Sequence, residues 1–304
     1  MEKLFIERYT DLKQFKGTTI RDRSRKIVLD TLSFGLNVSG VMNEALKRPR
    51  VQFLYIHHIF KDEEILLKKL IERLLKDHTF ISYGEAVNRI LTGVVDKPFV
   101  CISSDDGLKN NTRAAAILAD YGLKACFFIC PSMIGENDYE KVKNFSKHQL
   151  HFPPVEFMNW DDIEKLQQQG HEIGGHTTSH VNLAKCDRLQ LTDQIGGCYT
   201  EIAKHCGPVK HFAFPYGRYF HFSGDAQKSV FFAGFESCAS AERGCHISPA
   251  GTVIKKEDLF IRRDHILLTW PIDHILFFMA RNAQKAAVQN NYYRYDENNN
   301  NNKQ

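Results

Sequence analysis

The sequence predicts an α/β fold whose parallel strands form either an open sheet or a barrel, and two observations lead to this prediction. First, short apolar runs typical of buried strands alternate along the chain with longer segments whose apolar residues recur at helical spacing. Strands that alternate with helices in this way usually build a parallel sheet covered by its helices. Second, the chain has 304 residues, of which 43% are hydrophobic. A chain of this size and composition folds around its own core without disulfides.

The first 49 residues are predicted to form a helical N-terminal extension. They contain charged runs and one amphipathic stretch, residues 27–46, which ends at Arg48-Pro49-Arg50. We favour the interpretation that this stretch packs on the side of the main domain or on another subunit. The alternative is peripheral contact with a membrane surface, to which amphipathic helices are suited.

The main domain is predicted to span residues 50–290. The helix at residues 62–77 is predicted from apolar residues at helical spacing, and three of the other helices end at a glycine, as helices often do. The predicted strands are residues 51–56, 97–104, 126–130, 172–175 and 209–214. The predicted helices are residues 62–77, 112–121, 160–169, 189–205 and 272–289. The tail, residues 291–304, contains a run of asparagines and is predicted to be disordered.

Charge and hydropathy narrow the range of partners. The 40 basic and 36 acidic residues leave a net charge of +4, which is too balanced for a nucleic-acid-binding protein. No stretch approaches the roughly 18–20 apolar residues that a transmembrane helix needs. Charged residues stand near the N-terminus, where a signal peptide would be apolar. We therefore expect no nucleic acid partner, no transmembrane segment and a cytoplasmic location.

The eight cysteines contain no pair at CxxC spacing. In a reducing compartment this favours free, mostly buried thiols. A structural zinc ion or a disulfide is the less favoured alternative.

Three polar clusters follow predicted strands, at the edge of a parallel fold where catalytic residues usually gather. Asp105 and Asp106 follow one strand, His176 and His180 follow another, and the Pro-Tyr-Gly segment 215–217 follows a third. Each cluster alone has an ordinary interpretation: a helix cap and turn, a pair of solvated or core histidines, or a strand-to-loop turn. Histidines four residues apart would lie on one face of a helical turn, from which both rings reach one ion.

Taken together, the three clusters form a coherent hydrolytic site. Two histidines and a carboxylate are the usual ligands of a catalytic zinc ion that keeps one position open for water. A second carboxylate can take a proton from that water, and a bare backbone N–H can hold the developing oxyanion. This set suits metal-assisted hydrolysis of an amide or an ester. Zinc (Zn²⁺) is the preferred ion, although cobalt, nickel and iron accept similar ligands.

At these residues the sequence resembles the polysaccharide deacetylases, which form carbohydrate esterase family four and carry a NodB-homology domain. The family motifs Thr-Phe-Asp-Asp-Gly, His-x-x-x-His and, in one branch, Phe-x-Phe/Tyr-Pro-Tyr-Gly correspond in order to residues 103–107, 176–180 and 212–217. The similarity covers about residues 50–268 and is close along residues 159–180. It implies a distorted (β/α) barrel of seven or eight strands, of NodB-homology type. It also implies metal-dependent removal of an N-acetyl group from a sugar.

The resemblance assigns roles to individual residues. Asp105 corresponds to the general base of the family. Asp106, His176 and His180 correspond to the metal ligands. The backbone N–H of Tyr216 corresponds to part of the oxyanion hole.

Other residues are expected at the site although the resemblance does not place a general acid. Arg263 resembles the arginine that follows the Pro-Tyr-Gly motif in one branch, and the nearby His265 is our candidate for the acid. A histidine on a surface strand is the alternative for His265. His57 ends the first strand and is expected to face the substrate or to make a hydrogen bond behind the site. Pro215 and Arg218, which flank the third motif, are expected to contact the substrate.

The predicted function is a metal-dependent hydrolase that removes the N-acetyl group of a sugar or glycan precursor. Two alternatives stay open: an amidase that acts on a C–N bond outside sugars, and a catalytically inactive glycan-binding relative. The last stays open because the general acid is not placed and because Ser103-Ser104 stands where the family has Thr-Phe. His171 is expected to be structural. The sequence predicts no oligomeric state.

Overall fold

The structure, a computed structural model, describes residues 5–12, 20–248, 251 and 253–286. The tail predicted to be disordered, residues 291–304, lies outside this part of the chain. None of the described helices is long and apolar enough to cross a lipid bilayer.

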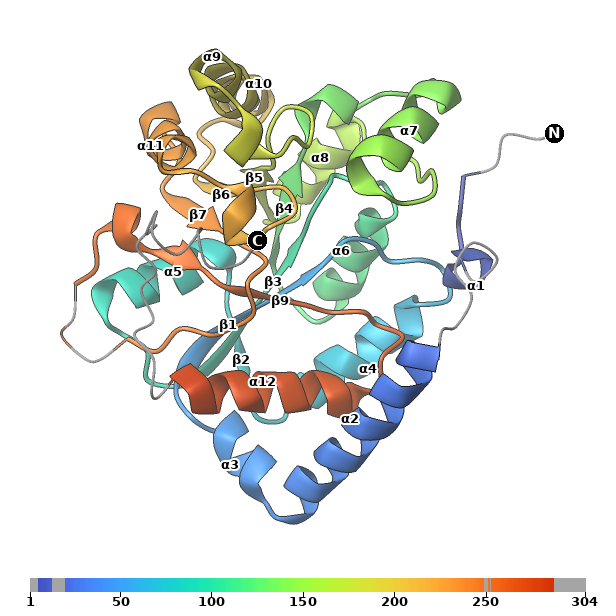
Figure 1. The fold of residues 1–304 in the computed structure, drawn as a ribbon, viewed down its shortest axis with the longest axis vertical. Coiled ribbons are helices and arrows are strands. Elements are labelled where there is room, and N and C mark those ends of the chain that lie inside the picture. The colour runs from blue at the N-terminus through green and yellow to red at the C-terminus, as the bar shows by residue number, and fades with distance from the viewer. Residues whose placement is uncertain (1–4, 13–19, 249–250, 252, 287–304) are drawn as a thin grey trace.

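The strands form a parallel barrel with helices around it (Figure 1). Eight strands follow one another in the order β8-β7-β6-β5-β4-β3-β1-β9, and β2 pairs beside β3. The two ends of this path are β8 and β9, which only Arg262 separates in the chain, so the ring is nearly closed. This confirms the prediction of a (β/α) barrel of seven or eight strands. The strands are β1 (Arg50–Ile56), β2 (Thr79–Phe80), β3 (Pro98–Ser104), β4 (Ala125–Ile129), β5 (Glu172–Gly175), β6 (His211–Ala213), β7 (Ser237–Ala239), β8 (Phe260–Ile261) and β9 (Arg263–His265).

Most helices follow a strand and cover the outside of the barrel. Three of them, α5, α7 and α11, lie where no helix was predicted, and β7, β8 and β9 are two or three residues long, too short for a periodic pattern. The helices are α1 (Tyr9–Leu12), α2 (Ile20–Val38), α3 (Val41–Leu46), α4 (Glu64–Leu74), α5 (Tyr83–Thr92), α6 (Asn111–Asp120), α7 (Tyr139–Phe145), α8 (Trp160–Gln168), α9 (Arg188–Leu191), α10 (Gly197–Cys206), α11 (Gly224–Ala233) and α12 (Ile272–Ala286).

Alternation along the strands divides the core into two shells. Phe53 in β1 and Phe128 in β4 belong to a cluster inside the barrel, which Tyr83 and other apolar residues of α5 join. Their neighbours Leu54 and Phe127 belong to the larger cluster between strands and helices. Because successive side chains of a strand point to opposite faces, the same alternation decides which polar residues point into the barrel at its open end.

The helical N-terminal region is confirmed, but residues 27–46 do not form one helix. The chain forms α2 and α3, and Gly40 between them adopts a left-handed φ of 75°. Both helices pack against α12 (Figure 1). The His274 ring in α12 lies 2.7 Å from the Asp30 carboxylate in α2. Residues 189–205 are also interrupted, because a π-helical turn at Thr192–Gly196 separates α9 from α10.

Gly174 in β5 lies where the strand passes close to other interior groups. A Cβ at this position would collide with the Phe128 ring and lie 2.9 Å from the His211 carbonyl oxygen. We expect Gly174→Ala to lower the free energy of unfolding by about 1–3 kcal/mol, because an overpacked interior must shift. Urea denaturation measures this change.

Gly196→Ala is the matched control. The nearest side-chain atom to a Cβ at Gly196 is 4.0 Å away, so the alanine variant should be as stable as the wild type or more stable by about 0.5–1 kcal/mol. Equal stabilities of the Gly174→Ala and Gly196→Ala variants would contradict the packing described for β5.

Candidate active site

The barrel brings the predicted site residues together at the carboxyl ends of its strands. Asp105 and Asp106 follow β3, and His176 follows β5. Tyr216 lies three residues beyond β6, and Arg263 lies in β9. These segments are far apart in sequence, and the parallel order of the strands places their ends around one opening.

Asp106, His176 and His180 form a buried cluster whose donor atoms all lie within 4.8 Å of one another. The Nε2 atom of each histidine is 3.5 Å from the Asp106 Oδ1 atom, which is buried and has no hydrogen-bond partner among the described residues. The His176 Nδ1 atom lies 2.7 Å from the Ala213 carbonyl oxygen and donates to it, which leaves the Nε2 lone pair facing the cluster. An unpartnered carboxylate oxygen beside two imidazole nitrogens fits a divalent cation.

The four-residue spacing predicted that a helical turn brings the two histidines together, but the structure has no helix at this point. His176 leaves β5 in a tight turn, in which Thr177 and His180 adopt left-handed φ values of 61° and 54°. The turn reverses the chain within four residues and brings the rings to 5.1 Å between centroids. The prediction that both rings reach one point therefore holds, but the helical geometry behind it was wrong.

Left-handed backbone is concentrated at this site. Five described residues other than glycine have positive φ: Asp106, Thr177, His180 and Tyr216, and also His151, whose ring lies 6.4 Å from that of Tyr216. Such conformations cost energy for residues with a Cβ and persist where the surroundings enforce them. The fold therefore tolerates unfavourable backbone conformations here, and these conformations direct the side chains and backbone groups toward one place.

The carboxylate of the cluster is ionised and one of its histidines is neutral near neutral pH. Burial alone would raise the pKa of Asp106, but its interactions with His176, His180 and His57 outweigh burial and hold the pKa below its usual value. Burial lowers the pKa of His180 to about 4. A carboxylate and an uncharged imidazole are the forms that bind a metal ion.

Asp105 is held by a buried ion pair with Arg263. The two guanidinium nitrogens donate to the two carboxylate oxygens at 2.7 and 2.9 Å, and both residues are at most 3% exposed. Burial favours the neutral carboxyl, but the charge of Arg263 outweighs it and keeps the pKa of Asp105 below its usual value. Arg263 also donates to the Ser240 carbonyl oxygen and lies 4.4 Å above the Tyr55 ring. This fixes the direction of the Asp105 carboxylate.

His57 and His265 form a second pair at the same opening. The His57 Nδ1 and His265 Nε2 atoms are 3.0 Å apart, and the His265 ring stacks on Tyr55. Desolvation lowers the pKa of both rings. The two acids Asp106 and Asp105 act in the opposite direction on His57. His57 follows Ile56, which pairs with Ser104 just before the two acids, so His57 leaves β1 beside them.

The Pro-Tyr-Gly turn presents a backbone N–H at the opening. Tyr216 has a left-handed φ of 63°, and within the described part of the chain its N–H has no hydrogen-bond partner. Gly217 also has a φ of 63°, and a Cβ there would lie 2.5 Å from the Ala241 backbone nitrogen. The Tyr216 ring meets the His180 ring edge-on at 4.9 Å. Pro215 is buried, and Arg218 is exposed with its guanidinium 3.0 Å from Glu242.

Sequence reasoning missed a polar clamp that lies behind β9. Asp264 points away from the opening and is buried, and it accepts hydrogen bonds from Gln52 in β1 and Asn282 in α12. Arg243 lies 3.4 Å from the same carboxylate. Because Arg263 and His265 flank Asp264 in the strand, the clamp fixes the register in which both reach the site. The sequence feature that could have indicated this clamp is Gln52, a single polar residue within an otherwise apolar strand.

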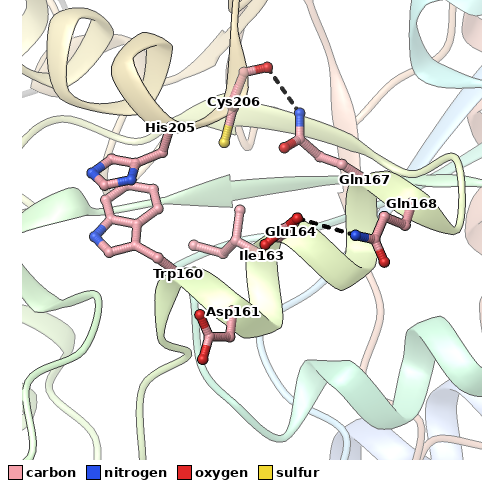
Figure 2. A pocket seen from close by; sticks show the side chains of 8 residues that line it. All are labelled: Trp160, Asp161, Ile163, Glu164, Gln167, Gln168, His205 and Cys206. Carbon is pink, nitrogen blue, oxygen red and sulfur yellow. Dashed lines mark hydrogen bonds between the residues drawn. The ribbon is translucent and has the colours of Figure 1, made fainter.

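Other candidates lie outside the site. His171 accepts a hydrogen bond from the backbone N–H of Ala125 and has the structural role expected of it. All eight cysteines are free. A surface hollow of about 580 Å³ lies between α8 and α10, where the Trp160 and His205 rings stack at 3.8 Å (Figure 2). None of the predicted site residues lines it.

Comparison with known proteins agrees with this geometry. Residues 92–233 match the family model of polysaccharide deacetylases. A curated peptidoglycan-N-acetylglucosamine deacetylase of Bacillus cereus is 29% identical over 119 residues, which are 38% of this chain. The chain spans 35% of the length of that relative.

Solved structures share the fold. The structure of IcaB from Ammonifex degensii superimposes with a TM-score of 0.59 at 15% identity, over 77% of this chain and 98% of that one. The Streptococcus pyogenes deacetylase PplD superimposes with a TM-score of 0.58 at 16% identity, with the same shares covered. Residues 92–233, which include Asp105, His176 and Tyr216, are therefore similar to the polysaccharide deacetylases.

The buried clamp at Asp264 makes stability depend on pH. Burial raises the pKa of this carboxyl above its usual 3.8 to about 6. The folded state therefore holds the proton more tightly than the unfolded state, and stability is lost as pH rises from about 4 through 6. The Asp264→Asn variant has no such proton. Compared with it, the free energy of unfolding of the wild type should fall by up to about 3 kcal/mol over this range. Urea denaturation of both proteins between pH 4 and 7 measures the difference. A difference that does not change with pH contradicts the prediction.

Proposed function

We propose that this protein is a metal-dependent hydrolase that removes the N-acetyl group from a sugar of a glycan or glycan precursor. The observation that carries the proposal is the buried cluster of Asp106, His176 and His180 next to the Arg263-held carboxylate of Asp105. The match to the family model and the deacetylase name of the curated relative support it. Zinc is the proposed ion, because two imidazoles and one carboxylate are its usual ligands at catalytic sites.

The chain's own groups supply most of the chemistry that the reaction needs. A divalent cation held by Asp106, His176 and His180 would polarise the amide carbonyl and acidify water. Asp105 is the general base and takes a proton from the attacking water on a carboxylate oxygen. Arg263 keeps this carboxylate ionised and pointed at the opening. The free N–H of Tyr216 donates to the oxyanion that develops on the carbonyl oxygen.

In this proposal the leaving amine takes its proton from the imidazolium form of His57, which the carboxylates of Asp106 and Asp105 favour against desolvation. His57 lies near both acids, whereas the His265 Nε2 atom is occupied by its contact with His57. In this proposal His265 acts through His57 and orients its ring, whereas the sequence predicted His265 as the candidate acid and His57 as a substrate contact or a supporting hydrogen-bond partner. Pro215 is buried and sets the turn at Tyr216, so it supports the site from beneath. The cytoplasmic location and the absence of a nucleic acid partner stay predictions.

Two substitutions distinguish the proposed base, Asp105, from the proposed metal ligands. Asp105→Asn should retain the metal ion and lose about 10²–10⁴-fold in turnover, because a positioned general base contributes that much. His176→Ala should lose the metal as well as turnover. Metal content and release of acetate from N-acetylated oligosaccharides measure the two effects.

Two outcomes would overturn these roles. Full turnover by Asp105→Asn on a substrate that the wild type deacetylates would exclude Asp105 as the base. Unchanged metal content in His176→Ala would exclude the proposed ligand set. Release of ammonia or an amine without acetate would favour an amidase that acts on a C–N bond outside sugars.

The two histidines of the second pair are expected to differ in their effect. His57→Ala should reduce turnover by about 10²–10⁴-fold with no loss of metal, as expected for a general acid. His265→Asn keeps a polar partner for His57 and should have a smaller effect, seen as a shift in the basic limb of the pH–rate profile. A larger loss of turnover in His265→Asn than in His57→Ala would indicate that His265, not His57, is the general acid.

A further inference from the structure

We propose that the outer face of α2 and α3 docks this protein onto a membrane surface that contains anionic lipids. This inference goes beyond deacetylation and does not depend on it, because it rests on residues that lie outside the candidate active site. The outer face is defined here by Ile27, Phe34, Val38 and Val41, together with the exposed basic residues at its two ends.

The inner side of α2 is already occupied by the fold. Leu29 is 8% exposed and Ser33 is 4% exposed. Asp30 contacts His274 in α12, and Arg25 lies 4.5 Å above the Trp270 ring. An amphipathic helix that packs by one face alone would be polar on the other side.

The outer side of α2 is apolar instead. Ile27 is 65% exposed, Phe34 and Val38 are both 72% exposed, and Val41 at the start of α3 is 41% exposed. Positions 27, 34 and 38 are seven and four residues apart, so they lie in one line along the helix. Of thirteen large hydrophobic side chains exposed in the described part of the chain, six lie between residues 27 and 41, and four of these six form the outer face. Those outside residues 27–41 are spread over the rest of the molecule. Among the described residues, this segment therefore has the densest group of exposed apolar side chains.

The positive charge of the same segment indicates which kind of surface binds to this face. Residues 20–48 contain six basic and three acidic residues, so they hold +3 of the chain's net charge of +4. Lys26 is paired with Asp30, and Lys47 with Glu44. Arg23 at one end and Arg48 at the other are exposed. Each such residue near an anionic lipid surface is attracted to it.

A second copy of the chain is a poorer fit to this face. The apolar line has basic residues at both ends. A second copy bound through this face would bring the same exposed arginines to the interface from both sides, and like charges there oppose association. A lipid surface with negative headgroups meets both ends favourably and accepts the apolar side chains between them.

The position of α2 relates this surface to the opening of the barrel. Arg25 covers Trp270, which follows the carboxyl end of β9. The first turns of α2 thus lie on the same side of the barrel as the candidate active site, and α2 runs from there along the outer wall towards α3 (Figure 1). A membrane along α2 would lie beside the opening.

Vesicle sedimentation of the full chain tests the proposal. The protein should sediment with vesicles of phosphatidylcholine mixed with phosphatidylglycerol, and less with phosphatidylcholine alone or at high salt. The double variant Phe34→Ser/Val38→Ser should bind the mixed vesicles at least about tenfold more weakly, because it loses most of the apolar contact. Arg23→Gln/Arg48→Gln should lose the preference for phosphatidylglycerol.

Phe232→Ser is the matched control, because Phe232 is 95% exposed on α11, away from this face. It should bind vesicles as the wild type does. Thermal unfolding checks that each variant is folded. Two results would overturn the proposal: no sedimentation of the wild type with mixed vesicles, or equal sedimentation of wild type and Phe34→Ser/Val38→Ser. A dimer in light scattering that the serine variant abolishes, without vesicle binding, would assign the face to a second copy.

Discussion

The buried ion pair between Arg263 and Asp105 is the interaction on which the site depends. Arg263 lies in β9, the strand that completes the ring, and Asp105 lies at the end of β3. β1 separates these strands and pairs with both. A buried charge without its partner costs about 3–5 kcal/mol, so the position of β9 and the placement of the Asp105 carboxylate stabilise each other. The guanidinium can reach the carboxylate only when β9 has the observed register, which the Asp264 clamp holds from the other face of the strand.

The backbone at the opening shows how the fold prepares the site before any ligand arrives. Asp106, His180 and Tyr216 all adopt left-handed conformations, and a Cβ at Gly217 would press on the Ala241 backbone. These features are unfavourable locally and are stable only because strands on both sides fix them. The result is a set of donor atoms and an N–H that converge with little rearrangement. Preorganisation of this kind is what electrostatic catalysis requires.

The sequence predicted most of the fold and the identity of the candidate cluster, because both depend on local patterns. Apolar runs predicted β1, β3 and β4, and three motifs at strand ends predicted Asp106, His176 and Tyr216 as site residues. What it did not predict depends on contacts between distant segments. The pairing of His57 with His265 and the clamp on Asp264 exist only because β9 pairs with β1 and α12 packs behind it. A three-residue strand has no periodicity from which such pairing can be deduced. The helical turn assumed for His176 and His180 failed for a different reason: their spacing fits a tight turn as well as a helix.

Metal titration of metal-free protein tests the central claim most directly. Acetate release from an N-acetylated oligosaccharide should be absent in the metal-free protein and should rise with added zinc to a plateau at about one equivalent, the stoichiometry of a three-ligand site. His176→Ala should show no such rise. Acetate release that persists without metal, or a protein that binds no zinc, would contradict the account.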